Sequence, residues 1–205
     1  PTQHCVPVYG GDSTVNGVAG ILQAYRDGLN TVKLSGPTHF QPLLQNAGYL
    51  AQSSGCTQDN QNYTVLLILT DGIVDDMDGT IAEIVKASAL PLSVIIVGIG
   101  NEDFSDMNKL DGENSKEKDD GTGALMHGDM KSHRDIVQFV HFKKWSKKGP
   151  MALAQHVLAD VPKQIISYCE EHQILPNEPA PPPADDDAEA PAMPAVGGDA
   201  PPDYA

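Results

Sequence analysis

The hydrophobic pattern of the chain predicts three strands. Residues 65–69 form an unbroken apolar run that stops just before Asp71, and residues 93–100 form a second run. Strands without polar alternation are typical of parallel sheets that helices cover on both faces. Residues 136–140 predict a third strand. A β-rich stretch at residues 5–9 is expected to lie at the sheet edge, because its proline cannot donate a ladder hydrogen bond.

Apolar side chains at helical spacing predict the elements between these strands. Pro162 is expected to kink the last helix or split it in two. Strands that alternate with helices favour an α/β fold, a Rossmann-like, mostly parallel sheet that is flanked by helices and joined by right-handed crossovers. The predicted helices cover residues 18–29, 40–50, 81–89, 104–110 and 153–168.

Two polar side chains mark a candidate site. Asp71 follows the first buried strand, and the carboxyl ends of the strands open onto the ligand crevice in α/β sheets. An Asp-Gly pair is equally typical of a simple turn after a strand. Thr38 stands in the turn before the second helix, where its hydroxyl either caps that helix or points into the same crevice. The aspartates at 75, 76 and 78 are expected to stabilise the N-terminus of the helix that follows them.

Composition divides the chain into a domain over residues 1–175 and a tail over residues 176–205. The tail is acidic and proline-rich and carries no Lys or Arg, so it is expected to be disordered. The formal net charge of −15 argues against nucleic-acid binding, which needs a basic face. One local exception is the group of four lysines around Trp145, which is either a solvated face or a site for an anion or a lipid headgroup.

The cysteines and the apolar runs indicate a cytoplasmic protein. The three cysteines share no CxxC spacing, which fits reduced thiols and gives no support to a zinc site. No run approaches the 18 apolar residues typical of a membrane span, and no signal peptide is recognised. The expected location is therefore cytoplasmic, or peripheral at the plasma membrane.

Five strings in order resemble the C-terminal module of the copine family, a von Willebrand factor A-type domain. The resemblance runs from about Cys5 to Pro176 and leaves out the acidic tail. It implies the same layered α/β fold as the hydrophobic pattern. The strings are GVAGILQAY at 17–25, GPTHFQP at 36–42, LLILTDG at 66–72, LPLSVIIVGIG at 90–100 and RDIVQFV at 134–140.

The resemblance also implies a divalent-metal site. A-type domains hold Mg²⁺ or Ca²⁺ through an Asp-x-Ser-x-Ser loop, a Thr and an Asp, and Thr38 and Asp71 match the second and third of these. The first motif has no match in this sequence. Because Mg²⁺ prefers about six oxygens, metal binding by this chain alone is expected to be weak or absent. The central strand that carries the motif would be missing too. Its absence would leave the strand at 65–69 with an open edge and with apolar faces that nothing covers fully, and it suggests a piece of a longer protein.

The resemblance implies a non-enzymatic module that binds protein partners through the metal edge. Calcium-dependent membrane phospholipid binding belongs to upstream modules of the family that do not occur in this sequence. Two alternatives remain open: a copine-like domain of a ubiquitin ligase without its RING, and peripheral membrane binding through Lys143 to Lys148. An enzyme using Asp71 and His39 is disfavoured, because no HExxH or GxSxG motif is present.

Overall fold

The computed structural model describes residues 3–8, 14–111 and 124–178 of the chain. The chain divides into two units, Pro1–Leu175 and Pro176–Ala205, and all of the described helices and strands belong to the first unit. The described helices are α1 (Gly17–Thr31), α2 (Gln41–Ser54), α3 (Met77–Ala87), α4 (Met107–Leu110), α5 (Phe142–Ser146), α6 (Pro150–Val157) and α7 (Val161–Glu171). The described strands are β1 (Thr64–Thr70), β2 (Leu92–Gly98), β3 (Met126–His127), β4 (Met130–Lys131) and β5 (Val137–His141).

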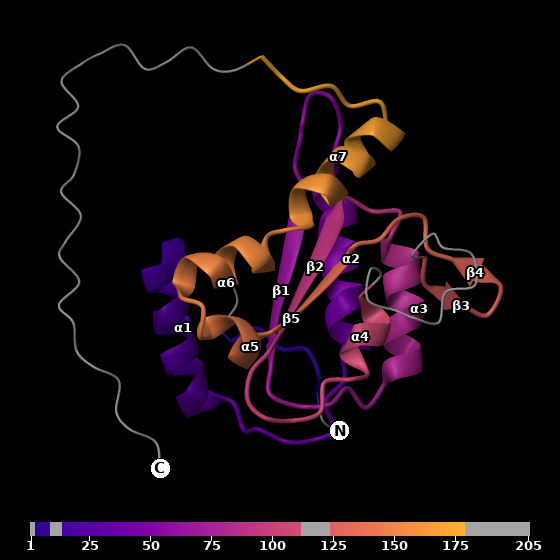
Figure 1. The fold of residues 1–205 in the computed structure, drawn as a ribbon. Coiled ribbons are helices and arrows are strands. Elements are labelled where there is room, and N and C mark those ends of the chain that lie inside the picture. Colours follow the sequence, from indigo (N-terminus) through magenta and orange to yellow (C-terminus); the bar gives the residue numbers. More distant parts are fainter. Residues whose placement is uncertain (1–2, 9–13, 112–123, 179–205) are drawn as a thin grey trace, which may run out of the picture. The chain divides into compact units, whose positions relative to one another are not determined.

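A three-stranded parallel sheet in the order β1-β2-β5 lies at the centre of the fold (Figure 1). Its register aligns Thr70 with Gly98, and Gly98 with His141. The three strands therefore end at the same level, and the residues that follow them share one carboxyl edge. This arrangement confirms the predicted α/β fold, a parallel sheet flanked by helices.

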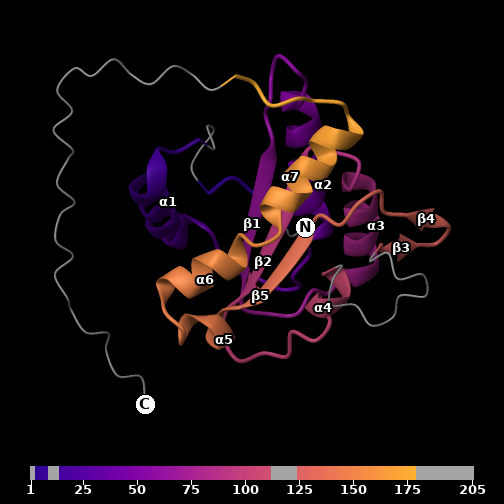
Figure 2. The same ribbon diagram turned by 45° about the horizontal axis from the view of Figure 1, so that its top comes forward.

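Helices cover the two faces of the sheet unequally. On one face, α2, α3 and α4 enclose the larger core, which includes Leu44, Ile84, Ile96, Met107 and Phe139. On the other face, side chains of α5, α6 and the start of α7 pack on a smaller core formed by Ile95, Val97 and Val140. Figure 2 shows α6 and α7 following one another along the sheet. The smaller core reaches β2 and β5 and stops short of β1.

The outer face of β1 is exposed as a result. Val65, Leu67 and Leu69 point away from the larger core and remain 45%, 54% and 63% exposed, whereas all seven residues of β2 are buried. The prediction from the hydrophobic pattern that residues 65–69 are buried on both faces is therefore wrong for one face. The expectation from the family resemblance that the apolar faces of this strand are not fully covered is confirmed. Among the described strands β1 pairs only with β2, so its other edge carries unpaired backbone groups. The expectation of an open edge at this strand is confirmed.

Helix α1 is amphipathic, but its apolar side chains do not reach a core of the described residues. The apolar spacing that predicts this helix is correct, and the helix ends with Val32 donating its backbone N–H to the carbonyl of Gly28. Its large apolar side chains are nevertheless exposed, and a helix with such a face normally buries it against another element. These side chains are Val18, Ile21, Leu22, Tyr25 and Leu29.

Other differences from the sequence predictions are local. Residues 5–8 form no strand, and residue 9 lies outside the described part. The segment between α4 and β5, for which the sequence analysis predicts no strand, contains the antiparallel β3–β4 hairpin; its residues 112–123 lie outside the described part. Pro162 stands at the start of α7, where its missing N–H has no intrahelical partner to lose, and the last predicted helix is accordingly two helices. The tail that is predicted to be disordered lies outside the described part of the chain from residue 179 onward.

The exposed face of β1 predicts concentration-dependent self-association of the isolated chain. The double substitution Leu67→Thr and Leu69→Thr introduces β-branched side chains, which favour strands, and removes the large apolar surface. We expect it to weaken self-association by about tenfold or more, measured by analytical ultracentrifugation over a concentration series. The matched control is Leu34→Thr, an exposed leucine outside the sheet. An unmutated chain that stays monomeric and unfolds in one sharp transition would refute this prediction.

Candidate functional site

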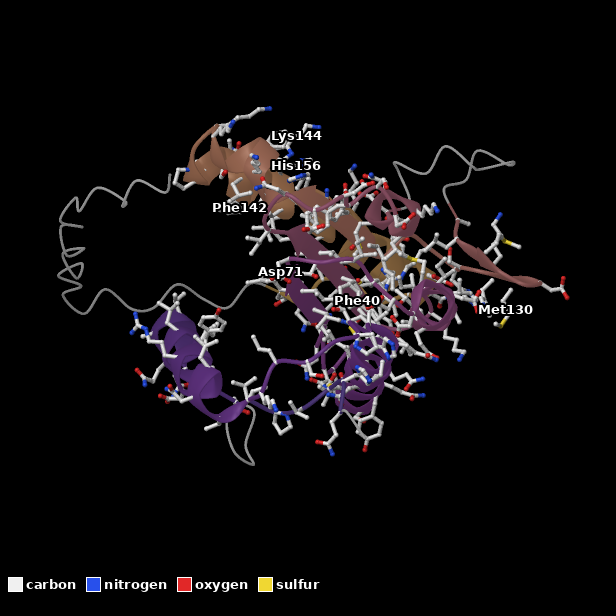
Figure 3. The ribbon with its side chains drawn as sticks, turned by 90° about the horizontal axis from the view of Figure 1, so that it is seen from below. Phe40, Asp71, Met130, Phe142, Lys144 and His156 are labelled. Atoms are coloured by element: carbon white, nitrogen blue, oxygen red, sulfur yellow. The ribbon has the colours of Figure 1, made fainter. Side chains whose placement is uncertain are left out.

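Asp71 is the first residue after β1 and lies exposed at the carboxyl edge of the sheet. The preceding Thr70 shapes a local turn, because its hydroxyl donates to the Gly72 carbonyl and accepts from the Gly72 N–H, both at 3.3 Å. Figure 3 looks onto this edge from below and labels Asp71 and Phe40 there. A turn is therefore present, as one interpretation of the Asp-Gly pair predicts, and it leaves the Asp71 carboxylate accessible to solvent.

The loop that carries Thr38 is paired with the loop that follows Asp71. The Thr38 N–H donates to Asp75 Oδ2 at 2.7 Å, and the Asp75 N–H donates to the Thr38 carbonyl at 2.9 Å. These two hydrogen bonds join backbone segments that are 37 residues apart in the sequence. The two predicted metal ligands thus stand on loops that are in direct contact.

Asp76 strengthens this contact by capping the N-terminus of α2. Its carboxylate accepts the backbone N–H groups of Phe40 and Gln41, each at 2.9 Å, and also the Thr80 hydroxyl at 3.1 Å. The first N–H groups of a helix have no intrahelical partner and carry partial positive charge, so a carboxylate is a favourable cap. The N-cap position of α2 is occupied by Phe40, which has no polar side chain.

Two sequence predictions are corrected by this arrangement. Thr38 does not cap the second helix, because α2 begins only at Gln41 and its cap comes from Asp76. The expected role of the aspartates at the start of the following helix is corrected in part. Asp76 is the N-cap residue of α3 and its carboxylate accepts the Thr80 hydroxyl, but the carboxylates of Asp75 and Asp76 also bind the Thr38–Gln41 segment. Only Asp78 lies in the first turn of α3. We call the contact between residues 38–41 and 75–76 the loop latch.

The donor set fits a divalent cation only in part. The carboxylates of Asp75 and Asp76 accept backbone N–H groups, whereas the two predicted ligands, the Thr38 hydroxyl and the Asp71 carboxylate, belong to exposed residues. No cluster of three or more His, Cys, Asp or Glu side chains suited to a metal occurs in the described part of the chain. Two oxygens satisfy a minority of the roughly six positions that Mg²⁺ prefers. A complete site would need donors from outside the described residues.

His39, the histidine that sequence reasoning placed nearest the crevice, is half-buried next to Thr38. Its ring stacks on that of His4, with ring centroids 4.1 Å apart. The neighbouring Cys5 accepts a hydrogen bond from the Asn46 amide at 3.8 Å. The N-terminal segment therefore reaches the start of α2, a contact that no local pattern in the sequence indicates.

A second polar cluster lies at the opposite edge of the sheet, around Arg134. The guanidinium group donates to the carbonyls of Leu90, Leu92 and Gln164 and to the Tyr63 hydroxyl. It also lies against the rings of Tyr63 and Tyr168, with Cζ 5.8 and 5.3 Å from the centroids. Arg134 thus joins the beginnings of β1 and β2 to α7. Its side chain is buried, and we assign it a structural role.

Comparison with known proteins identifies relatives over nearly all of the described region. The family model described as Copine matches residues 2–177. Copine-A of Dictyostelium discoideum is 42% identical over 176 residues, which is 85% of this chain and 28% of the relative. Nicotinic receptor-associated protein 1 of Caenorhabditis elegans is 40% identical over 177 residues, which is 81% of this chain and 26% of the relative. The chain therefore spans little more than a quarter of the length of these relatives.

Proposed function

The chain belongs to the copine family, and on that premise we propose that it is a non-enzymatic module that recruits protein partners through the carboxyl edge of its sheet. The name of one relative, nicotinic receptor-associated protein 1, describes association with another protein and supports this class of function. Calcium-dependent phospholipid binding by a whole protein of this family, and a cytoplasmic or peripheral membrane location, are part of the same proposal.

The observation that carries the proposal is the loop latch beside two exposed oxygen donors. Asp75 and Asp76 hold the Thr38 loop against the loop after Asp71, so the edge is organised before any partner arrives. Preorganisation of this kind lowers the entropic cost of binding. In the proposed site, Thr38 and Asp71 hold one side of a Mg²⁺ or Ca²⁺ ion, and an acidic side chain of the partner and water complete the oxygen shell.

Among the described residues, no helix is both long enough and apolar enough to span a bilayer. Recruitment of a partner at the sheet edge needs only that the edge be accessible, and both proposed ligands are exposed.

Asp71→Asn and Thr38→Ala test the proposed metal site. Alone, the chain is expected to bind Mg²⁺ or Ca²⁺ weakly, with a Kd on the order of 10⁻³ M, because it offers two of the needed ligands. Each substitution is expected to weaken binding about tenfold further, measured by isothermal titration with the metal alone. Stability should change little, because Thr38 joins the latch through its backbone and Asp71 lies outside the latch.

The matched control is Asp59→Asn, an exposed aspartate in the loop between α2 and β1. Metal-dependent capture of partner proteins should be lost in the two site variants and kept in the control. Equal metal binding by all four proteins would contradict the proposed ligands. Capture that is unchanged when the metal is chelated would contradict the shared-metal mechanism.

A further inference from the structure

We propose that α5 and the beginning of α6 form a surface that binds anionic phospholipid headgroups directly, without calcium. We call it the lysine patch and define it as residues 142–151. It comprises Lys143, Lys144, Lys147 and Lys148 together with Phe142, Trp145 and Met151. The inference is independent of the proposed protein-recruiting role of Thr38 and Asp71.

The local charge of the patch is opposite to that of the chain. Residues 136–159 contain no Asp or Glu, although the whole chain carries a formal net charge of −15. All four lysines are exposed. Lys143 donates to the Asn101 side chain, and two acids, Glu102 and Asp103, follow Asn101 in the sequence. The side chains of Lys144 and Lys147 have no hydrogen bond or ion pair with any other described residue.

Trp145 gives the patch a fixed aromatic platform. The indole stacks on His156 with ring centroids 3.8 Å apart, and Lys148 Nζ lies 3.8 Å from the centroid of the indole ring. Trp145 also packs on the smaller core beneath it. Burial lowers the pKa of His156, as do the charges of Lys144 and Lys148, while Asp160 and Asp111 act in the opposite direction. At neutral pH the positive charge of the surface therefore comes from the lysines.

Exposed apolar side chains flank the lysines, which favours a lipid surface over a purely acidic partner. Phe142 is 38% exposed and Met151 is 72% exposed. Surfaces that bind anionic bilayers combine cationic side chains for the headgroups with apolar and aromatic side chains for the interface. Figure 3 shows Phe142, Lys144 and His156 grouped on α5 and α6. An acidic peptide would be held by the lysines alone and would gain little from Phe142 and Met151.

The patch occupies the carboxyl edge of the sheet, because α5 follows β5 directly. The register places His141 level with Gly98 and Thr70, so the patch and Asp71 lie at the same edge. A bilayer at the patch would therefore meet the molecule from that edge.

Sedimentation with vesicles tests the inference on the 205-residue chain in buffer that contains EDTA. The vesicles are phosphatidylcholine alone or phosphatidylcholine with phosphatidylserine. We expect binding only to the anionic vesicles, and weaker binding at high salt. The double variant Lys144→Gln and Lys147→Gln should weaken binding roughly 25-fold, since each lysine near an anionic surface contributes about fivefold. The variant Met151→Ser should weaken binding by a smaller factor, through loss of the apolar contact.

The matched control is the double variant Lys33→Gln and Lys131→Gln, which removes the same charge from exposed lysines outside the patch. Circular dichroism of each variant establishes that it is folded. Equal loss of binding in this control, binding that persists in the patch variant, or equal binding to neutral vesicles would overturn the inference. Tighter binding to soluble polyglutamate than to anionic vesicles, or no effect of Met151→Ser, would overturn the inference of a lipid ligand. Either result would indicate that the lysine patch binds an acidic protein instead.

Discussion

Replacing Arg134 with methionine is expected to lower the free energy of unfolding by about 3 kcal/mol. Methionine retains much of the length of the side chain but removes the hydrogen bonds to Leu92, Gln164 and Tyr63. It also removes the cation that lies against the Tyr63 and Tyr168 rings. Because these groups belong to β2, to α7 and to the residue just before β1, the loss is expected to loosen α7 first. Urea unfolding followed by tyrosine and tryptophan fluorescence measures the change.

Two further variants make the Arg134 prediction specific. Arg134→Lys keeps the charge but lacks the planar fork of donors, so it should lie between the methionine variant and the unmutated chain. Arg26→Met, at an exposed position of α1, should change stability by less than about 0.5 kcal/mol. If Arg134→Met and Arg26→Met were equally stable, the buried guanidinium would not be a significant tie between the strands and α7.

The second large effect is expected for Asp76→Ala, at about 2 kcal/mol of lost stability. The substitution leaves the N–H groups of Phe40 and Gln41 without their carboxylate and removes an acceptor from the buried Thr80. The start of α2 and the Thr38 loop should then become mobile together. Hydrogen exchange read by mass spectrometry should show faster exchange in residues 38–44, together with a lower midpoint in urea.

Asp78→Ala is the control for this prediction, because it removes the same charge two residues away. The Asp78 side chain is 93% exposed and its partner is His127 Nε2, 3.4 Å from Asp78 Oδ1. We expect a change of less than about 0.5 kcal/mol, since an exposed ion pair contributes little. Similar losses in the two variants would mean that the effect arises from net charge or from α3, and not from the cap on α2.

The elements that sequence reasoning predicts correctly are those encoded by neighbouring residues. The apolar runs at β1 and β2 and the helical spacing in α2 and α3 are local, and the structure places strands and helices there. The parallel order of the sheet follows because each pair of strands is connected by a helix-bearing crossover. Pro162 is similarly informative, because its effect on a helix depends on its own ring.

The predictions that failed depend on contacts between distant segments. The sequence around Asp76 predicts a role at the start of the helix that follows it, but it does not indicate that the same carboxylate also binds a segment 35 residues earlier. Arg134 looks like an ordinary charged residue before a strand, and only the fold brings Tyr63 and Gln164 to it. The exposed face of β1 is a comparable case. A run of apolar residues indicates that a strand can be buried, but it does not indicate whether another element of the fold covers each face of the strand.

The level ends of the three strands set a limit on what can bind at the carboxyl edge at one time. Adjacent strands are about 4.8 Å apart, so the backbones at Asp71 and Phe142, two strands away from each other, are separated by only about 10 Å. A specific protein interface covers about 800 Å² on each side, a footprint roughly three times as wide as that separation. A protein bound at Asp71 would overhang α5, and a bilayer in contact with α5 would block access to Asp71. If both proposals hold, lipid and protein would therefore be mutually exclusive occupants of a single copy of this chain.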